Sequence, residues 1–191
     1  MTYRADHFTA LLDACVLADV FKRNLLLSLA RAELFRPRWS TQILDETERA
    51  ILKITKGEAD GKKQRAVIER AFRDACVTGY SALIPAVTLP DADDRHVLAA
   101  AIHTKAQVLV TDNLKDFPPD ELAKFGIELK SSDEFIADTI TLHEQTAFGA
   151  IKAMRARYQN PALTTGKIIQ FAESRSLLST ALLLKEYEQY W

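Results

Sequence analysis

The sequence predicts an α/β fold with a central parallel sheet, followed by a C-terminal helical extension. Two observations support this prediction. Up to about residue 135, short apolar runs of strand length alternate with longer segments whose apolar residues recur at helical spacing. Beyond that point the strand signals stop and the helical spacing continues. We therefore expect an α/β domain over residues 1–135 and a helical extension over residues 136–191.

The expected strands are short apolar runs that are followed by turn residues. They cover residues 8–13, 107–111 and 126–129. Another apolar run, residues 83–89, contains Pro85, which cannot donate a hydrogen bond to a neighbouring strand, so we expect an edge strand or an extended connection there. Because helical segments separate the runs, we expect right-handed crossovers and parallel strands.

The expected helices have apolar residues three or four positions apart. Ser40 or Thr41 is the expected N-cap of the second helix, and Ser131 with Glu134 fits a capping box further along. A short helix is expected to open at Pro118 and Pro119. The other expected helices cover residues 16–34, 43–54, 62–76, 97–102, 138–158, 165–173 and 177–190.

Composition narrows the class of protein. The 191 residues carry a net charge of −1, so we do not expect tight non-specific binding to nucleic acid through charge alone. Cys15 and Cys76 lack metal-type spacing and are expected to be small buried residues. Residues 1–7 show no signal-peptide pattern, and no run of about 18 apolar residues occurs. These features predict a cytosolic protein with no membrane span.

Acidic residues stand at the edges of four separate expected elements. They are Asp13, Glu46, Asp94 and the pair Asp112 and Asp116. Because the carboxyl ends of parallel strands meet at one edge of a sheet, these side chains could converge there. Two carboxylates about 5 Å apart repel by roughly 3 kcal/mol at an effective dielectric of about 20. Such a cluster favours a hard cation, Mg²⁺ or Mn²⁺, and chemistry on phosphate esters.

Each acid also has a plain structural interpretation. Asp13 and Asp94 could cap the helices that follow them, which is the better explanation for either residue taken alone. Glu46 could be a solvated helix residue, and Asp112 and Asp116 could be turn residues. The metal-site interpretation therefore depends on the whole set falling on one edge of one sheet.

Four motifs, taken in order, resemble the PIN domain, the metal-dependent ribonuclease fold of the VapC-type toxins. The resemblance covers roughly residues 8–135. It implies a Rossmann-like, three-layer fold, and the helical tail resembles that of a subset of bacterial PIN toxins. The motifs are Leu11-Leu12-Asp13, the helix from Ser40 to Glu46, the segment from Asp93 to Ala101, and the segment from Val110 to Phe117.

The resemblance implies that Asp13, Glu46 and Asp94 are metal ligands and catalytic residues. Asp116 is the favoured fourth carboxylate, and Asp112 is its substitute. The position that is often Asp in the family is Asn113 here, which can ligate or hydrogen-bond without charge.

Thr111 is expected to orient a ligand or a metal-bound water, and Ser40 to support the Glu46 helix. The pair Ala14-Cys15 departs from the Thr-Asn pair of many relatives, so we expect any polar role there to be lost. His96 and His103 are expected to be structural, because a third zinc ligand is missing.

Several basic residues could contact RNA. Arg95 follows Asp94 and could touch a phosphate, although a salt bridge is an equal alternative. The other basic candidates are Arg36, Arg38, Lys62, Lys63 and Arg65, for which a solvated face is the plain alternative.

The function that the resemblance implies is a Mg²⁺- or Mn²⁺-dependent endoribonuclease that acts as the toxin of a toxin–antitoxin pair. It also implies an RNA substrate, a small antitoxin partner and a possible homodimer. Two alternatives stay open. One is a PIN-fold RNA-processing factor or DNA nuclease, and the other is a non-catalytic PIN-like binding module. We expect the helical tail to be separable from catalysis, because it carries none of the four acidic signals.

Overall fold

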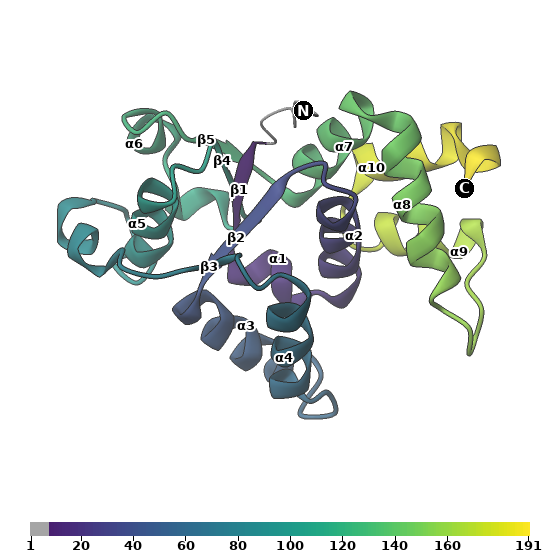
Figure 1. Cartoon of the computed structure of the whole chain (residues 1–191), viewed down its shortest axis with the longest axis horizontal. Helices are drawn as coiled ribbons and strands as arrows, with labels where there is room; N and C mark the ends of the chain where they lie inside the picture. The colour runs from purple at the N-terminus through teal and green to yellow at the C-terminus, as the bar shows by residue number, and fades with distance from the viewer. Residues whose placement is uncertain (1–7) are drawn as a thin grey trace, which may run out of the picture. The chain divides into compact units, whose positions relative to one another are not determined.

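A five-stranded parallel sheet forms the centre of the structure, a computed structural model that describes residues 8–191 (Figure 1). The leader prediction for residues 1–7 lies outside the described residues. The strand order is β3-β2-β1-β4-β5, as expected for a doubly wound sheet. The strands are β1 (Thr9–Leu12), β2 (Arg36–Ser40), β3 (Cys76–Val77), β4 (Val108–Val110) and β5 (Glu128–Lys130).

Helices cover both faces of this sheet. Helix α5 contacts β1, β2 and β4, while α3 contacts β2 and packs on α1. Helices α1, α3 and α4 lie on one face of the sheet and α5 and α6 on the other (Figure 1), as right-handed connections would place them. This three-layer arrangement confirms the predicted fold class. The bounds are α1 (Ala14–Ala18), α3 (Thr41–Ile54), α4 (Gly61–Ala71), η1 (Ser81–Ala86), α5 (Arg95–His103), η2 (Leu114–Asp116) and α6 (Pro119–Ala123).

Strand β2 was missed by the sequence analysis, because Pro37 reads as a helix breaker. The register explains how the sheet accommodates it. Pro37 lies opposite Ala10 of β1, whereas β3 pairs only with Trp39 and Ser40. On the β3 side, the Trp39 N–H donates to Ala75 O at 3.1 Å. Pro37 lies two residues before Trp39 and faces the same side of β2, beyond the part that pairs with β3. The sheet therefore does not need the N–H that proline lacks.

Two further expectations for this region were wrong. Residues 83–89 contribute no strand, because Ser81–Ala86 form the 3-10 helix η1, which holds Pro85. The edge strand is instead the two-residue β3, which begins inside the helix expected over residues 62–76. That helix ends at Ala71, since the chain must become extended to reach the edge of β2.

The first long helix of the prediction is broken at Asp19, whose backbone is extended. The break separates α1 from α2 (Val20–Arg31). By contacts the described chain divides into two compact units. The first runs up to Asp19 and then over Arg36–Ser131, and the second comprises Val20–Phe35 and Ser132–Trp191. Helix α2 therefore belongs with the C-terminal helices, although it is encoded near the start of the sequence.

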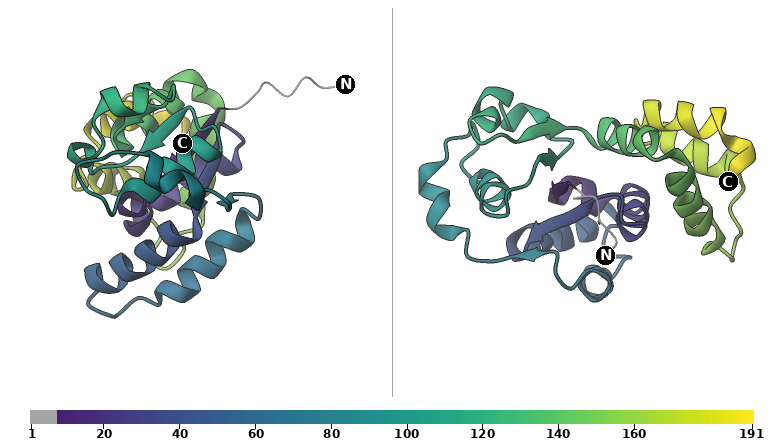
Figure 2. Two further views of the ribbon diagram at one scale, coloured as in Figure 1. Left: turned by 90° about the vertical axis from the view of Figure 1, so that its left-hand side faces the viewer. Right: turned by 45° about the horizontal axis from the view of Figure 1, so that its top comes forward.

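The second unit is entirely helical (Figures 1 and 2). Helix α2 packs on α7 and α8, and α10 packs on α7 and α9. The expected helix over residues 138–158 is two helices, because His143 leaves the helical conformation between them. The bounds are α7 (Ser132–Leu142), α8 (Glu144–Ala156), α9 (Thr165–Glu173), α10 (Leu178–Glu186) and η3 (Glu188–Tyr190).

Aromatic contacts tie the two segments of this unit together. Phe35 meets Phe135 edge-on at 4.8 Å between ring centroids, and Phe21 meets Phe171 at 5.8 Å. The Arg175 guanidinium lies over both Phe21 and Phe171. Among the described residues, every helix is too short or too polar to cross a lipid bilayer.

Candidate functional site

The carboxyl edge of the sheet gathers polar residues from three elements. Leu12 pairs with Val110, so Asp13 and Thr111 follow adjacent strand ends. The Asp13 N–H donates to Val110 O at 3.0 Å, which fixes the start of α1 against β4. Asp94 stands at the start of α5, next to this edge. The convergence that was predicted for these acids therefore occurs around Asp13 and Asp94.

Asp13 is almost fully buried, at 6% exposure, and its carboxylate accepts three hydrogen bonds. Oδ1 accepts from Ala14 N at 2.6 Å, while Oδ2 accepts from Thr111 Oγ1 at 2.7 Å and from Cys15 Sγ at 3.2 Å. Asp13 thus does cap α1, as its plain structural interpretation predicted. A carboxylate offers about four lone-pair positions, so roughly one remains, on Oδ1.

Asp94 also begins a helix, but its side chain makes no cap hydrogen bond. Its Oδ2 accepts instead from Asn113 Nδ2, at 3.2 Å. Carboxylate oxygens of Asp91, Asp94 and Asp116 lie within 4.8 Å of one another. Asp91 was not among the acids that the sequence analysis singled out. Its place two residues before Asp93 and three before Asp94 was the signal that could have added it to the site.

Burial and negative neighbours shift the protonation of these acids. The pKa of Asp94 is raised to about 6, first by burial and then by the charges of Asp13, Asp91 and Asp116; His96 acts in the opposite direction. The pKa of Asp13 is raised above its usual range by burial, although its hydrogen bonds lower it, and the Glu46 charge adds to the rise. The cluster is therefore electrostatically unfavourable at neutral pH without a counter-charge.

Glu46 lies apart from the three closest carboxylates. Its Oε1 is 3.0 Å from Nε2 of His96 and 3.9 Å from the Arg49 guanidinium. His96 is 2% exposed, and neither ring nitrogen has a hydrogen-bond partner, so its contact with Glu46 is close but poorly aligned. Asp112 is exposed and outside the close group of three. Of the predicted acids, Asp94 and Asp116 belong to the described group of carboxylates that lie within 4.8 Å of one another.

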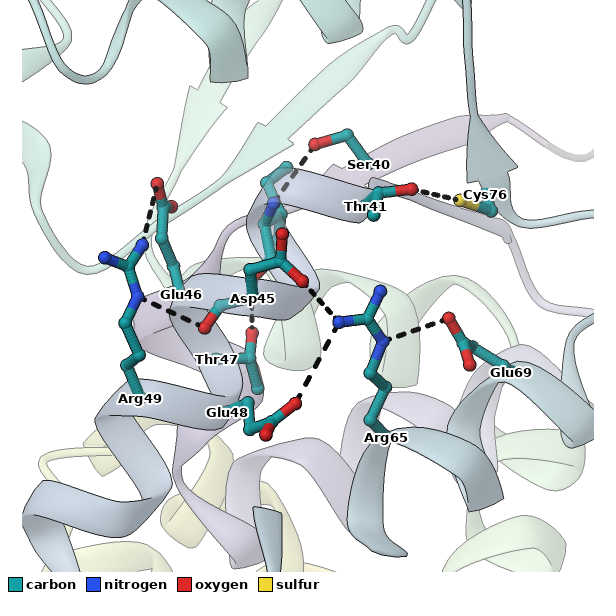
Figure 3. Close-up of polar contacts among 11 residues, drawn as sticks. Ser40, Thr41, Asp45, Glu46, Thr47, Glu48, Arg49, Arg65, Glu69 and Cys76 are labelled. Carbon is teal, nitrogen blue, oxygen red and sulfur yellow. Dashed lines mark hydrogen bonds and ion pairs between the residues drawn. The ribbon is translucent and has the colours of Figure 1, made fainter. Parts of the chain in front are cut away.

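The helix that carries Glu46 is positioned by Ser40. The Ser40 Oγ accepts from Ile43 N at 3.1 Å, which confirms Ser40 as the N-cap of α3 (Figure 3). Ser40 is fully buried, so it fixes the start of the helix rather than facing a ligand. On the same helix, Arg49 donates to the Asp45 carbonyl at 3.3 Å and lies 3.9 Å from Glu46 Oε1 (Figure 3).

The expectation that Ala14-Cys15 carries no polar role was wrong. The Cys15 thiol donates to Asp13 Oδ2, lies 3.2 Å from Thr111 Oγ1, and accepts from Asp112 N at 3.2 Å. The residue as a whole is exposed, but these contacts hold its sulfur atom toward the acids. Burial of the thiol, followed by the Asp13 charge, raises the pKa of Cys15 to about 12.

Two of the basic candidates, Arg65 and Arg38, have partners away from the acidic edge. Arg65 ties α4 to α3 by contacting the carboxylates of Asp45, Glu48 and Glu69 (Figure 3). Arg38 donates to the Asp74 carbonyl. Both guanidinium groups therefore already have acceptors within the chain.

The two remaining arginine candidates are Arg36, near the amino ends of the strands, and Arg95, near their carboxyl ends. Arg36 pairs with Thr9 at the other edge of the sheet, four residues or about 13 Å along β1 from Asp13. Arg95 directly follows Asp94, and its Nε is buried without a hydrogen-bond partner.

The donor set suits a hard divalent cation. It consists of carboxylate oxygens from Asp91, Asp94 and Asp116, with one lone pair of Asp13 beside them, and Asn113 holding Asp94. Mg²⁺ and Mn²⁺ prefer such oxygen ligands, and neither cysteine nor histidine completes a soft-metal site among the described residues. Positive charge here would offset the repulsion that raises the Asp94 pKa.

Comparison with known proteins gives two family matches along the chain. Residues 9–115, more than half of the chain, match the family described as "PIN domain". Residues 132–186 match the family described as "VapC50 C-terminal domain", and this range falls within the second compact unit. The matched boundaries leave residues 116–131, which include Asp116, outside both matches.

One curated relative is similar over part of the sequence. It is named "Putative ribonuclease VapC50" and comes from Mycobacterium tuberculosis strain H37Rv. The two are 38% identical over 91 residues, which is 48% of this chain and 53% of the relative. The chain therefore matches about half the length of that protein. No solved structure matches the chain significantly.

Proposed function

The chain belongs to the PIN domain family and is a homologue of a VapC-type ribonuclease, and from this premise we propose that it is a metal-dependent endoribonuclease. The observation that carries the proposal is the cluster of Asp91, Asp94 and Asp116 at the carboxyl edge of the sheet, next to Asp13. A fold that keeps these acids within 4.8 Å of one another accepts their repulsion, which a cation would relieve.

The residues that would hold Mg²⁺ or Mn²⁺ are Asp94 and Asp116 with Asp91, together with Asp13. Glu46 completes the proposed acidic set from the side of His96. When bound, such a cation lowers the pKa of a water molecule and offsets negative charge on the phosphate. The chain itself then needs no nucleophilic side chain, which agrees with a site made of carboxylates.

The remaining polar residues would orient the acids and the substrate. Asn113 holds the Asp94 carboxylate, and Thr111 holds that of Asp13. The Arg95 guanidinium carries an unsatisfied buried Nε, so a phosphate oxygen of RNA would supply its missing acceptor. Water would attack the phosphorus in line, and the cut would leave a 5′ phosphate.

We further propose that this nuclease is the toxin of a toxin–antitoxin pair and acts in the cytoplasm. The match of the second unit to the C-terminal domain of VapC50 supports this role. The proposed partner is a small antitoxin that covers the acidic edge, and the toxin could form a homodimer. In this proposal the nuclease machinery lies within residues 1–135, and residues 136–191 form the extension.

Asp94→Asn tests the nuclease proposal. The purified protein is incubated with labelled RNA and with Mg²⁺, Mn²⁺ or EDTA, and cleavage products are resolved by length. We expect cleavage with either cation, none with EDTA, and a loss of roughly 100-fold or more in Asp94→Asn. Asp93→Asn is the matched control, because Asp93 is adjacent, exposed and outside the close carboxylate group. Undiminished cleavage by folded Asp94→Asn would refute the assignment.

Expression in a bacterial host separates a toxin from a processing nuclease. We expect arrested growth with the wild type and normal growth with Asp94→Asn. Metal-dependent cleavage without growth arrest would favour the RNA-processing alternative, and metal binding without cleavage of RNA would favour the binding module.

A further inference from the structure

Cys15 occupies an unusual place among the residues of the acidic edge. It is two residues after Asp13 and lies on α1, while its other contacts come from the segment that follows β4. The Asp112 N–H donates to Sγ at 3.2 Å, and Sγ donates to Asp13 Oδ2 at 3.2 Å. A single atom thus connects the ends of the two central strands.

This contact is part of a short chain of hydrogen bonds. The Asn113 N–H donates to Thr111 Oγ1 at 3.1 Å, and Thr111 donates to Asp13 Oδ2 at 2.7 Å. Oδ2 of Asp13 therefore has two side-chain donors, one sulfur and one oxygen. Each donor is in turn the acceptor of a backbone N–H from the loop after β4. Both lone pairs of Oδ2 are used, so the carboxylate is held in one rotation with Oδ1 on the other side.

From these contacts we infer that Cys15 is a positioning residue that acts together with Thr111 to fix the Asp13 carboxylate, so that its remaining Oδ1 lone pair faces the cation. The inference rests on the proposed metal site. It assigns to Cys15 neither metal ligation nor a reaction of its own. Removing the thiol leaves Oδ2 with one donor, and the carboxylate can then rotate. Partners that orient a metal ligand typically contribute 10–100-fold to metal affinity.

Cys15→Ala and Cys15→Ser separate positioning from packing. Alanine removes the donor, whereas serine keeps a hydroxyl that can donate to Asp13 and accept from Asp112. Mn²⁺ affinity is measured without RNA, by the electron paramagnetic resonance signal of free Mn²⁺ during titration. We expect an affinity about 10-fold lower in Cys15→Ala and within about threefold of the wild type in Cys15→Ser. Cys76→Ala is the control, because Cys76 is exposed and contacts only Thr41 among the described polar contacts of its thiol.

A double-mutant cycle with Thr111→Val checks that the two donors share one acceptor. If both hold Oδ2, their effects on Mn²⁺ affinity are not additive. Circular dichroism confirms that each variant is folded. Equal Mn²⁺ affinity in Cys15→Ala and wild type, or equal losses in the alanine and serine variants, would overturn the inference. A wild type that binds no Mn²⁺ would instead overturn the proposed function, so the two failures are distinguishable.

Discussion

Two aspartates near helix starts show how differently the two units use a carboxylate. In the helical unit, the Asp133 oxygens accept from Ser179 N at 2.8 Å and from Thr180 N at 2.9 Å, so both oxygens serve the first turn of α10. In the first unit, Asp94 begins α5 but makes no cap bond, and it faces the acids Asp91 and Asp116. Of these two acids, the one whose capping function is unused is the one that lies in the acidic cluster.

The arginines of the two units extend this contrast. Arg175 lies over Phe21 and Phe171 and donates to the Phe171 carbonyl, so it stabilises the packing of α9 on α2. Arg95, next to Asp94, keeps a buried Nε without a partner. The helical unit thus satisfies the polar groups that it buries, whereas the acidic edge retains unsatisfied ones, as expected where a ligand completes the structure.

Truncation after Phe135 is expected to have the largest effect, because it leaves α2 without most of its helical partners. It removes α8, which packs on α2, and most of the helical unit. Phe21, Leu25, Leu26 and Leu29 of α2 are buried in the whole chain. Exposing four such side chains costs about 6–12 kcal/mol, which is comparable to the total stability of a domain. We expect the fragment to be unfolded or aggregated by circular dichroism and size-exclusion chromatography.

A second fragment tests whether the first unit folds without the C-terminal helices. It ends at Ser131 and carries Glu or Lys at the four apolar positions of α2. We expect this fragment to be soluble, folded and able to bind Mn²⁺, because the strands and acids of the first unit are intact. Failure of both fragments to fold would show that the first unit depends on the C-terminal helices.

Removing the two compared aspartates is expected to change stability in opposite directions. Asp133→Ala removes both cap acceptors of α10 and should lower the free energy of unfolding by about 1–2 kcal/mol. Asp94→Asn relieves the repulsion between Asp94 and its acidic neighbours. It should raise the free energy of unfolding of the metal-free protein by about 1 kcal/mol, allowing for solvent screening of this half-exposed group. Chemical denaturation in EDTA measures both. A lower free energy of unfolding in Asp94→Asn would contradict the contrast between a capping Asp133 and a repelled Asp94.

The pH dependence of stability should show the smallest effect. The folded pKa of Asp94 is about 6, above its ordinary value of 3.8, so the folded state binds the proton more tightly than the unfolded state. Asp94 therefore costs stability at pH 7, and this cost is relieved as the pH falls through about 6 toward 4. We expect the difference in stability between metal-free wild type and Asp94→Asn to narrow from pH 7 to pH 5. A constant difference over this range would rule out the raised pKa.

Local signals were sufficient for most elements and for part of the site. Helical spacing located α9 and α3, and buried apolar runs located β1 and β4, because each pattern is set by residues close in sequence. Strand β2 was missed because the effect of Pro37 depends on which residues of β3 lie beside it. The membership of α2 in the helical unit was missed for a similar reason, since its partners α7 and α8 are distant in sequence.

In the site, residue type alone misjudged Cys15 and gave no indication of the neighbours of Glu46. Cys15 was taken as a non-polar departure from the family, whereas its sulfur atom meets Asp13 and the backbone of Asp112. Glu46 was placed with the ligands, and its observed neighbour is His96, which lies on a different helix. Both depend on tertiary contacts that spacing does not encode. Whether Glu46 and Asp13 bind a cation stays a prediction for the Mn²⁺ titrations.

The membership of α2 in the helical unit also bears on synthesis at the ribosome. Helix α2 ends at Arg31 and α7 begins at Ser132, so its partners are translated roughly a hundred residues later. At about 5–20 residues per second, the apolar face of α2 waits roughly 5–20 seconds for those partners. During this interval a nascent chain presents the side chains of Phe21, Leu25 and Leu29 to other chains or to chaperones. We therefore expect the yield of soluble protein to depend on the speed of translation through residues 32–131.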